Sequence, residues 1–182
     1  PSGRRPDAAF GSAVAADANF LVVGAPVSDV GGITVGQAFV YNATSGALVA
    51  TLNNPSPAND EFGTSVAVSG NLVVVGARRD STGASGAGSA YVFNASTGAL
   101  LTTLNNPTPE SEDFFGGSVA VSGNVVVVGA HYDNTVASNS GSAYVFNATT
   151  AALIATLNNP SPAGNDVFGF SVAVSGNSVV VG

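Results

Sequence analysis

The side chains that could do chemistry in this chain are its carboxylates, its few arginines and one histidine. The 182 residues include 11 acidic residues, four arginines and a single histidine, but neither cysteine nor lysine. Without cysteine there is no thiolate metal site, no cysteine nucleophile and no disulfide. A single histidine also cannot supply a two-histidine zinc site. What remains is the chemistry of oxygen ligands.

Five aspartates recur at fixed places beside short motifs. Three of them stand two residues before a Phe-Gly pair, and two follow Gly-Ala by three residues: Asp60, Asp113 and Asp166, then Asp80 and Asp133. Carboxylates are hard ligands that suit calcium, which is the one cofactor that the sequence indicates. The alternative is that these aspartates cap turns by accepting hydrogen bonds from backbone N–H groups.

Catalysis finds little support in the same residues. His131 lies near Asp133, but no Gly-x-Ser-x-Gly motif accompanies them, and we expect this histidine to be an exposed loop residue. Glu110, Glu112 and Asp113 could form the carboxylate pair of a glycosidase, yet they share one linker with no opposing wall. We therefore expect a protein that is not an enzyme.

The overall composition limits the partners. The net charge is −7 and the only cations are Arg4, Arg5, Arg78 and Arg79, so the basic surface that phosphates require is missing and we exclude nucleic acid. Apolar runs such as 72–75 are far shorter than the roughly 20 residues of a membrane span, so we exclude membrane insertion. With 45% hydrophobic and 8% charged residues, the chain must fold around a core.

The elements that position these residues come from an internal repeat. Phe-Gly begins at Phe10, Phe62, Phe115 and Phe168, at spacings of 52, 53 and 53 residues. The second copy reads FGTSVAVSGNLVVVGARRD and then GSAYVFNASTGALLTTLNNPTP, and the third copy repeats almost every position. Repetition at about 50 residues is typical of stacked supersecondary units.

Each copy contains four strand-like runs. In the second copy, 65–69 and 89–94 alternate with period two, 72–75 is continuously apolar, and 100–104 is the fourth run. Ser-Gly-Asn at 69–71 is typical of a tight hairpin turn. The pattern predicts an all-β protein of four-stranded antiparallel blades of β-propeller type, about three and a half blades in an incomplete ring. A β-solenoid or an open stack of sheets is the alternative.

The predicted organisation is a lead-in at 1–9, three blades, and two strands of a fourth. The blades span 10–61, 62–114 and 115–167, and the two strands occupy 168–182. Such a ring does not close, since propellers have about four to eight blades. We expect either that the chain continues beyond Gly182 or that other chains cover the open faces.

The motifs Phe-Gly, Ser-Val-Ala-Val, Val-Gly-Ala and Gly-Ser-Ala-Tyr-Val-Phe, in this order, resemble FG-GAP repeats, the blade units of integrin α-subunit propellers and of many bacterial surface proteins. Gly24-Ala25-Pro26 matches the Gly-Ala-Pro signature in full, whereas Gly76-Ala77 and Gly129-Ala130 lack the proline. The integrin calcium loop of alternating aspartates has no counterpart between the first two strands. The resemblance therefore implies the bacterial branch without that loop.

Sorting the loops of such a blade places nearly all charges at one end. The acids fall in the loops between second and third strands and in the linkers between blades, together with Arg78, Arg79, His131 and Tyr132, while Asp17 lies at the other end. Either this is a binding face, or long loops carry charge simply because they are solvated.

Three N-glycosylation sequons stand at one repeat position, at Asn42, Asn94 and Asn147. Turn chemistry alone would also favour asparagine there. The sequence thus predicts an extracellular or cell-surface module for adhesion, binding a protein or glycan ligand through its charged loop face. The alternative is a structural surface or filament protein whose partners are further copies of itself.

Overall fold

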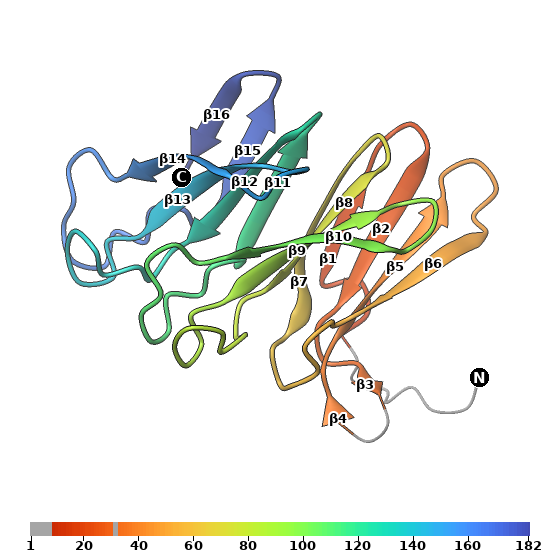
Figure 1. The fold of residues 1–182 in the computed structure, drawn as a ribbon, viewed down its shortest axis with the longest axis horizontal. Coiled ribbons are helices and arrows are strands. Elements are labelled where there is room, and N and C mark those ends of the chain that lie inside the picture. The colour runs from red at the N-terminus through yellow and green to blue at the C-terminus, as the bar shows by residue number, and fades with distance from the viewer. Residues whose placement is uncertain (1–8, 31–32) are drawn as a thin grey trace.

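The structure is a computed structural model that describes residues 9–30 and 33–182, and it confirms an all-β fold (Figure 1). The described residues form strands and turns without any helix, and so none that could cross a membrane. Three four-stranded antiparallel sheets follow one another, and a two-stranded sheet comes last. Residues 1–8, with Arg4 and Arg5 in the predicted lead-in, lie outside the described residues.

Each of these sheets takes its strands from one copy of the repeat. The first contains β1 (Ala13–Ala16), β2 (Phe20–Ala25), β5 (Gln37–Asn42) and β6 (Leu48–Asn53). The second contains β7 (Phe62–Ser69), β8 (Leu72–Ala77), β9 (Ser89–Asn94) and β10 (Leu100–Asn105). The third contains β11 (Ser118–Ser122), β12 (Val125–Ala130), β13 (Ser142–Asn147) and β14 (Leu153–Asn158), and the last pairs β15 (Val172–Ser175) with β16 (Ser178–Val181).

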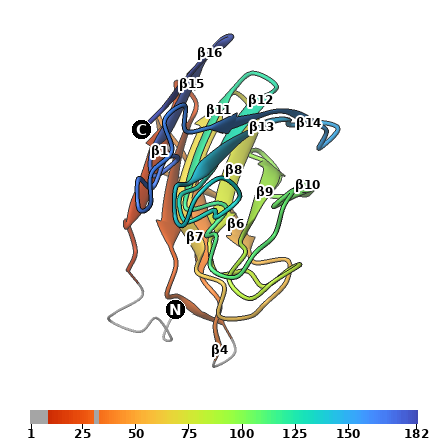
Figure 2. The same ribbon diagram turned by 90° about the vertical axis from the view of Figure 1, so that its left-hand side faces the viewer.

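The strands of a sheet are antiparallel neighbours in chain order, and the sheets fan out from their first strands. β1, β7, β11 and β15 lie next to one another, while the fourth strands point outward (Figures 1 and 2). In a solenoid, the strands of one sheet come from different repeats, whereas here all strands of a sheet come from the same repeat. The architecture is that of β-propeller blades in an unclosed arc.

One small element departs from the predicted plan. The first repeat has an extra hairpin, β3 (Asp29–Val30) with β4 (Ile33–Thr34), where the sequence suggested only a loop. Two-residue strands carry too little periodicity to be recognised in a sequence.

The core lies between consecutive sheets and has two different faces at each junction. In β9, Tyr91 and Phe93 point towards the first sheet, and Ala90 and Val92 point towards the third. Phe62 packs on both aromatic rings, at centroid distances of 5.7 and 5.9 Å. A bulky face thus meets a smaller face at each junction, which fills the space between twisted sheets.

A close backbone contact fixes each junction. A Cβ added to Gly76 would lie 2.0 Å from the carbonyl oxygen of Gly116, which belongs to the next Phe-Gly motif. Gly116 itself has φ +86°, and its carbonyl accepts a 2.7 Å hydrogen bond from the Ser65 hydroxyl. The same close contact occurs at the neighbouring junctions, where the glycine pairs are Gly24 with Gly63 and Gly129 with Gly169. The serine hydrogen bond recurs only at the Gly129–Gly169 junction, because Ala13 stands at that position in the first blade. The Phe-Gly and Gly-Ala signatures are therefore the two sides of one contact, which we call the glycine seam.

At the opposite end, hairpin turns of neighbouring blades are joined by hydrogen bonds. Gly70 N–H donates to the carboxylate of Asp17 at 2.8 Å, and Gly123 N–H and Gly176 N–H donate to the Ser69 and Ser122 hydroxyls at 3.2 and 3.0 Å. Asp17 is thus a structural link between two turns.

Replacing Gly76 by alanine should destabilise the protein by about 3 kcal/mol or more, because a backbone carbonyl occupies the place of the new methyl group and cannot rotate away. Urea unfolding measures this loss. Gly70→Asn is the matched control, because Gly70 also has positive φ but open space around it, and asparagine tolerates that conformation. Equal stability of Gly76→Ala and the parent chain would contradict the seam.

Candidate functional site

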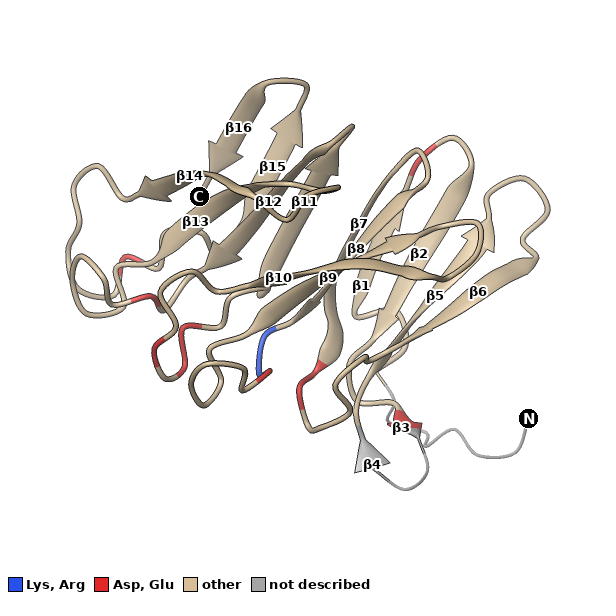
Figure 3. Cartoon of the chain, viewed as in Figure 1, with Lys and Arg blue, Asp and Glu red and all other residues tan. Residues whose placement is uncertain are grey.

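The charged residues of the described part of the chain gather at the end of the blades that carries the linkers and the loops between second and third strands (Figure 3). Asp17, at the β1–β2 turn, is the exception at the opposite end. Two structures at this end could serve a function: a row of exposed aromatic and arginine side chains, and pairs of buried aspartates below it.

The row begins with two arginines that share one carboxylate. Nε of Arg78 and Nε of Arg79 each lie 2.7 Å from an oxygen of Glu61. Both guanidinium groups also lie over the ring of Phe114, at 5.8 and 5.5 Å from its centroid. This contact crosses a blade junction, since Phe114 belongs to the linker that leads into the third blade.

The row continues through His131, whose position differs from the sequence prediction. The prediction of an exposed loop residue is wrong, because His131 is only 7% exposed. Its ring packs on Phe114, Tyr132 and Phe170 at centroid distances of 5.8, 4.6 and 5.4 Å. Burial, with a smaller effect from the Arg78 charge, lowers the pKa of His131, so the imidazole is neutral at physiological pH.

These residues form one surface feature because they lie close to the same two motifs in successive repeats. One set directly precedes or closely follows Phe-Gly, and the other set directly follows Gly-Ala. Tyr132 and Phe170 present exposed aromatic surface, and Arg79 is also exposed. We define the aromatic–arginine row as these seven residues: Glu61, Arg78, Arg79, Phe114, His131, Tyr132 and Phe170.

Sequence reasoning singled out four members of the row, placed Glu61 among the linker acids of the same face, and missed Phe114 and Phe170. The doubled phenylalanine at 114–115 was a usable signal, because the repeat requires only the second of the two. Phe115 is fully buried against Tyr144 and Phe146, which leaves Phe114 free to face the loops.

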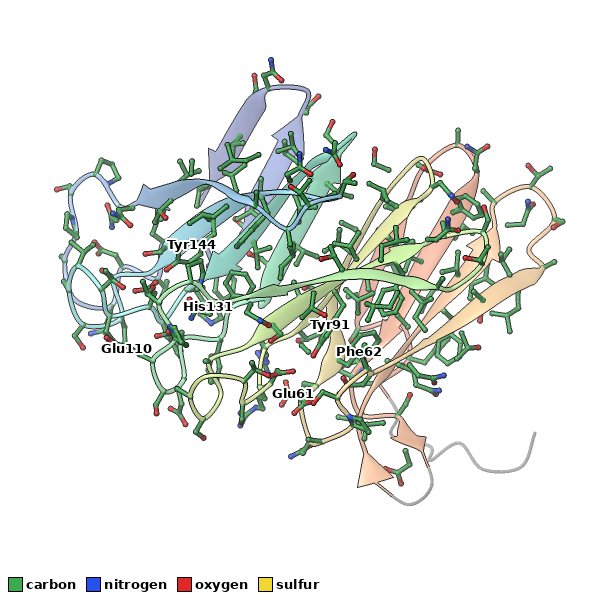
Figure 4. The ribbon with its side chains drawn as sticks, viewed as in Figure 1. Glu61, Phe62, Tyr91, Glu110, His131 and Tyr144 are labelled. Atoms are coloured by element: carbon green, nitrogen blue, oxygen red, sulfur yellow. The ribbon has the colours of Figure 1, made fainter. Side chains whose placement is uncertain are left out.

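The first pair of buried aspartates lies where the linker into the second blade meets the β8–β9 loop. Asp60 accepts a 2.8 Å hydrogen bond from the Asn54 amide. Asp80 accepts from the backbone N–H of Thr82 at 2.7 Å and from the Tyr91 hydroxyl at 2.6 Å. Tyr91 and Phe62 lie between the first two sheets (Figure 4).

The second pair repeats this arrangement one blade later. Oδ2 of Asp113 accepts from the Asn106 amide and from the backbone N–H of Glu110, both at 2.7 Å. Asp133 accepts from the backbone N–H of Thr135 at 2.7 Å and from the Tyr144 hydroxyl. Oδ1 of Asp113 is buried and has no hydrogen-bond partner.

The two linker aspartates, Asp60 and Asp113, have raised pKa values. Burial raises the pKa of Asp113 to about 6, against the hydrogen bond from the Glu110 N–H, and repulsion from Asp133 raises it further. Burial also raises the pKa of Asp60, with repulsion from Asp80 as a smaller cause. A carboxyl group in such a site is poised to hold a proton or to take a cation.

The fifth aspartate of the calcium prediction differs from the other four. Asp166 is exposed, and it accepts hydrogen bonds from the Asn159 amide at 2.8 Å and the backbone N–H of Ala163 at 2.6 Å. The turn-capping bonds that formed the alternative are thus present. Among the described residues, no three histidine, aspartate or glutamate side chains gather as a metal cluster, and calcium stays a prediction.

The three sequon asparagines cap the turns between third and fourth strands. Oδ1 of Asn94 accepts from the backbone N–H groups of Ser96 and Thr97, both at 3.0 Å, and Asn42 and Asn147 make the same kind of bonds. These bonds account for asparagine at this position, and glycosylation stays a prediction.

The geometry agrees with what comparison with known proteins finds. A family model described as "FG-GAP repeat" matches residues 1–41, 56–93 and 107–146, more than half of the chain. The chain therefore belongs to the FG-GAP repeat family, whose repeats are typical of extracellular proteins.

Solved structures support the fold. The chain is similar to the computationally designed Ika8 protein, with 21% identity and a TM-score of 0.58, over 94% of this chain and 42% of that one. It thus spans less than half the length of that structure. No curated protein matches.

The free energy of unfolding should fall as pH rises from about 4 to about 6. Because the folded pKa of Asp113 lies above its unfolded value, the native state binds the proton more tightly, and that stabilisation is lost as Asp113 ionises beside Asp133 and Glu110. A shift of this size corresponds to at most about 3 kcal/mol. Urea unfolding at several pH values measures it.

Asp113→Asn should remove most of this dependence, leaving the smaller part that Asp60 contributes with the same sign. Asp166→Asn, at the exposed equivalent position, should leave the dependence unchanged. A pH profile that Asp113→Asn does not alter would contradict the assignment.

Proposed function

We propose that this protein is an extracellular, non-catalytic adhesion or ligand-binding module that holds a protein or glycan through the aromatic–arginine row. The observation that carries the proposal is the row itself: seven side chains from three linkers and two loops, in mutual contact across two blade junctions. Membership of the FG-GAP repeat family supports a binding role in general.

The chemistry of the row suits a partner surface. Arginine and aromatic residues contribute most of the binding energy in many protein interfaces, because they combine apolar area with directed hydrogen bonds. Arg78 and Arg79 are the only lysine or arginine residues among the described ones, so anionic groups of a partner would be drawn to this place. A carboxylate of the partner could replace Glu61, whose ion pairs with the two arginines are partly exposed to solvent.

The rigidity of the scaffold also favours binding. The sheets below the row are locked by the glycine seams, so the row needs little ordering when a partner arrives. The strands of successive repeats are nearly identical, while Arg78-Arg79 in one repeat is replaced by His131-Tyr132 in the next. Sequence variation confined to loops on a constant scaffold is typical of recognition surfaces.

A glycan and matrix-protein array, probed with the parent chain and with an Arg78→Ala, Arg79→Ala, Phe170→Ala variant, tests the proposal. We expect the variant to lose at least tenfold in affinity for any ligand found, because it loses both cations and the most exposed ring of the row. Asn177→Ala, an exposed change at the opposite end, is the control. Ligands that bind the triple variant as well as the parent would contradict the role of the row.

Assembly through the repeats is a second candidate function, and one observation favours it. Val180 in β16 is 67% exposed, although its equivalents Val74 and Val127 are completely buried at blade junctions. Val14 in the first sheet is 70% exposed, while its equivalent Val66 is 8% exposed. Both outer faces thus expose valines whose equivalents are buried between neighbouring blades.

Sedimentation velocity over a hundredfold range of concentration separates the two functions. A structural role predicts polymers that grow with concentration and that Val180→Asp prevents. A binding role predicts a sedimentation coefficient that does not change with protein concentration, and a Val180→Asp variant that still binds the ligand.

A further inference from the structure

We propose that two copies of this chain bind each other side by side, through the outer edges of their three complete blades, and form a closed dimer. The contact surface consists of three pairs of exposed aliphatic residues, which we call the aliphatic rim: Leu48, Val49, Leu100, Leu101, Leu153 and Ile154. The rim lies beside the turns between third and fourth strands, at the end of the blades opposite to the aromatic–arginine row. The proposal does not depend on the ligand of that row.

The rim comes from the same positions in every complete repeat. Each pair is formed by the first two residues of the fourth strand, β6, β10 or β14, and these strands are the outer edges of their sheets (Figure 1). The six side chains are between 37% and 57% exposed. In a regular strand, consecutive side chains point to opposite faces, so two exposed neighbours require an explanation.

A β-bulge in each sheet supplies that explanation. Leu100 pairs with Phe93 and Thr102 pairs with Val92, which leaves Leu101 as an extra residue without a cross-strand partner. Val49 and Ile154 are the extra residues of the first and third sheets. A bulge breaks the alternation of side chains and interrupts the hydrogen-bond ladder, so these edges are unsuited to pairing with a further strand. What they present to a partner is aliphatic side chains.

Contacts between blades bring the pairs towards one another. A Cβ added to Gly98, in the β9–β10 turn, would lie 3.1 Å from Cβ of Ala50 and 3.6 Å from Cδ2 of Leu52, both in β6. Ala151, the equivalent of Gly98 in the third sheet, packs against the core between the second and third sheets. Each turn therefore leans on the preceding blade, and the aliphatic pair that follows the turn is held close to that blade.

The rim lacks the usual protection of an exposed edge. Edge strands of soluble proteins commonly carry lysine or another charged residue that keeps partners away, but β6, β10 and β14 contain no charged residue. Exposed aliphatic residues that gather without such protection are typical of a contact surface.

The distribution of charge favours a second copy as the partner. The net charge is −7, and in the described part of the chain every charged residue except Asp17 lies at the opposite end of the blades (Figure 3). Two copies that meet at their rims keep their acidic ends apart, and neither rim has to give up the hydration of a charge. A strongly cationic partner would instead be drawn to the acidic loops.

A lipid surface is a poorer partner for the rim. Segments that bind membrane interfaces combine aliphatic residues with aromatic and basic ones. The three fourth strands contain neither kind, and Arg78 and Arg79 lie at the far end of the blades.

The proposed contact uses the same surface on both partners, so it is isologous and stops at two copies. It thereby differs from assembly through the outer blade faces around Val14 and Val180, which would continue into polymers. It also leaves both aromatic–arginine rows exposed, because they lie at the other end of each chain.

Sedimentation velocity of a Val180→Asp chain tests the proposal, because this change should suppress growth through the outer blade face. We expect a monomer–dimer equilibrium that does not proceed beyond two copies. Adding Leu101→Glu and Ile154→Glu should weaken the dimer by more than about tenfold, since carboxylates of the two copies would be buried against each other. Val136→Glu is the matched control, because Val136 is an equally exposed aliphatic residue, at 44%, but lies in the β12–β13 loop. It should leave the dimer unchanged.

A charge exchange provides a second readout. The glutamate variant, mixed with a chain that carries Leu101→Lys and Ile154→Lys, should form dimers of one chain of each kind, while each variant alone sediments as a monomer. Circular dichroism checks that both variants are folded. The proposal would be overturned by a Val180→Asp chain that stays monomeric at every concentration, by a glutamate variant that dimerises as before, or by folded variants that do not associate when mixed. A monomeric chain that co-sediments with phosphatidylcholine vesicles would equally overturn it and would assign the rim to lipid.

Discussion

A carbonyl oxygen that occupies the place of a missing side chain is the constraint on which this structure depends. At each junction the second strand of one blade and the Phe-Gly motif of the next approach so closely that only glycine fits on the strand side. At the second and third junctions a serine hydroxyl also donates a hydrogen bond to this carbonyl, whereas Ala13 stands at the serine position of the first junction. At the seam, the distance between neighbouring sheets is therefore set by backbone atoms.

This backbone contact explains why the loop end can hold unfavourable groups. Buried carboxylates and a buried neutral histidine all reduce stability, and they are tolerated where the surrounding structure is already fixed. The carboxylates accept hydrogen bonds from tyrosines of the third strands and from asparagines that follow the fourth strands. The loop end is thus supported by the glycine seams, which directly follow its linkers.

Much of this arrangement is predictable from the sequence. The repeat, the all-β blades and the gathering of charge at one end follow from periodicity and from the alternation of long and short loops, both of which are local properties. The pairing of Asp60 with Asp80, the burial of His131 and the role of Phe114 depend on how consecutive blades stack, and a single repeat contains no information about its neighbour's loops. The β3–β4 hairpin was missed because its strands are too short to show a period.

The two unlike faces of each blade give the stack a direction. At each junction the bulky aromatic face of one blade packs on the smaller face of the preceding blade. Blades can therefore follow one another in one orientation, whereas a reversed blade would bring two aromatic faces together. Gain or loss of a whole repeat by unequal recombination would therefore leave every remaining junction intact. The arc could lengthen or shorten in evolution without redesign of its interior, while each added copy brings a fresh set of loops on which new specificity can be selected.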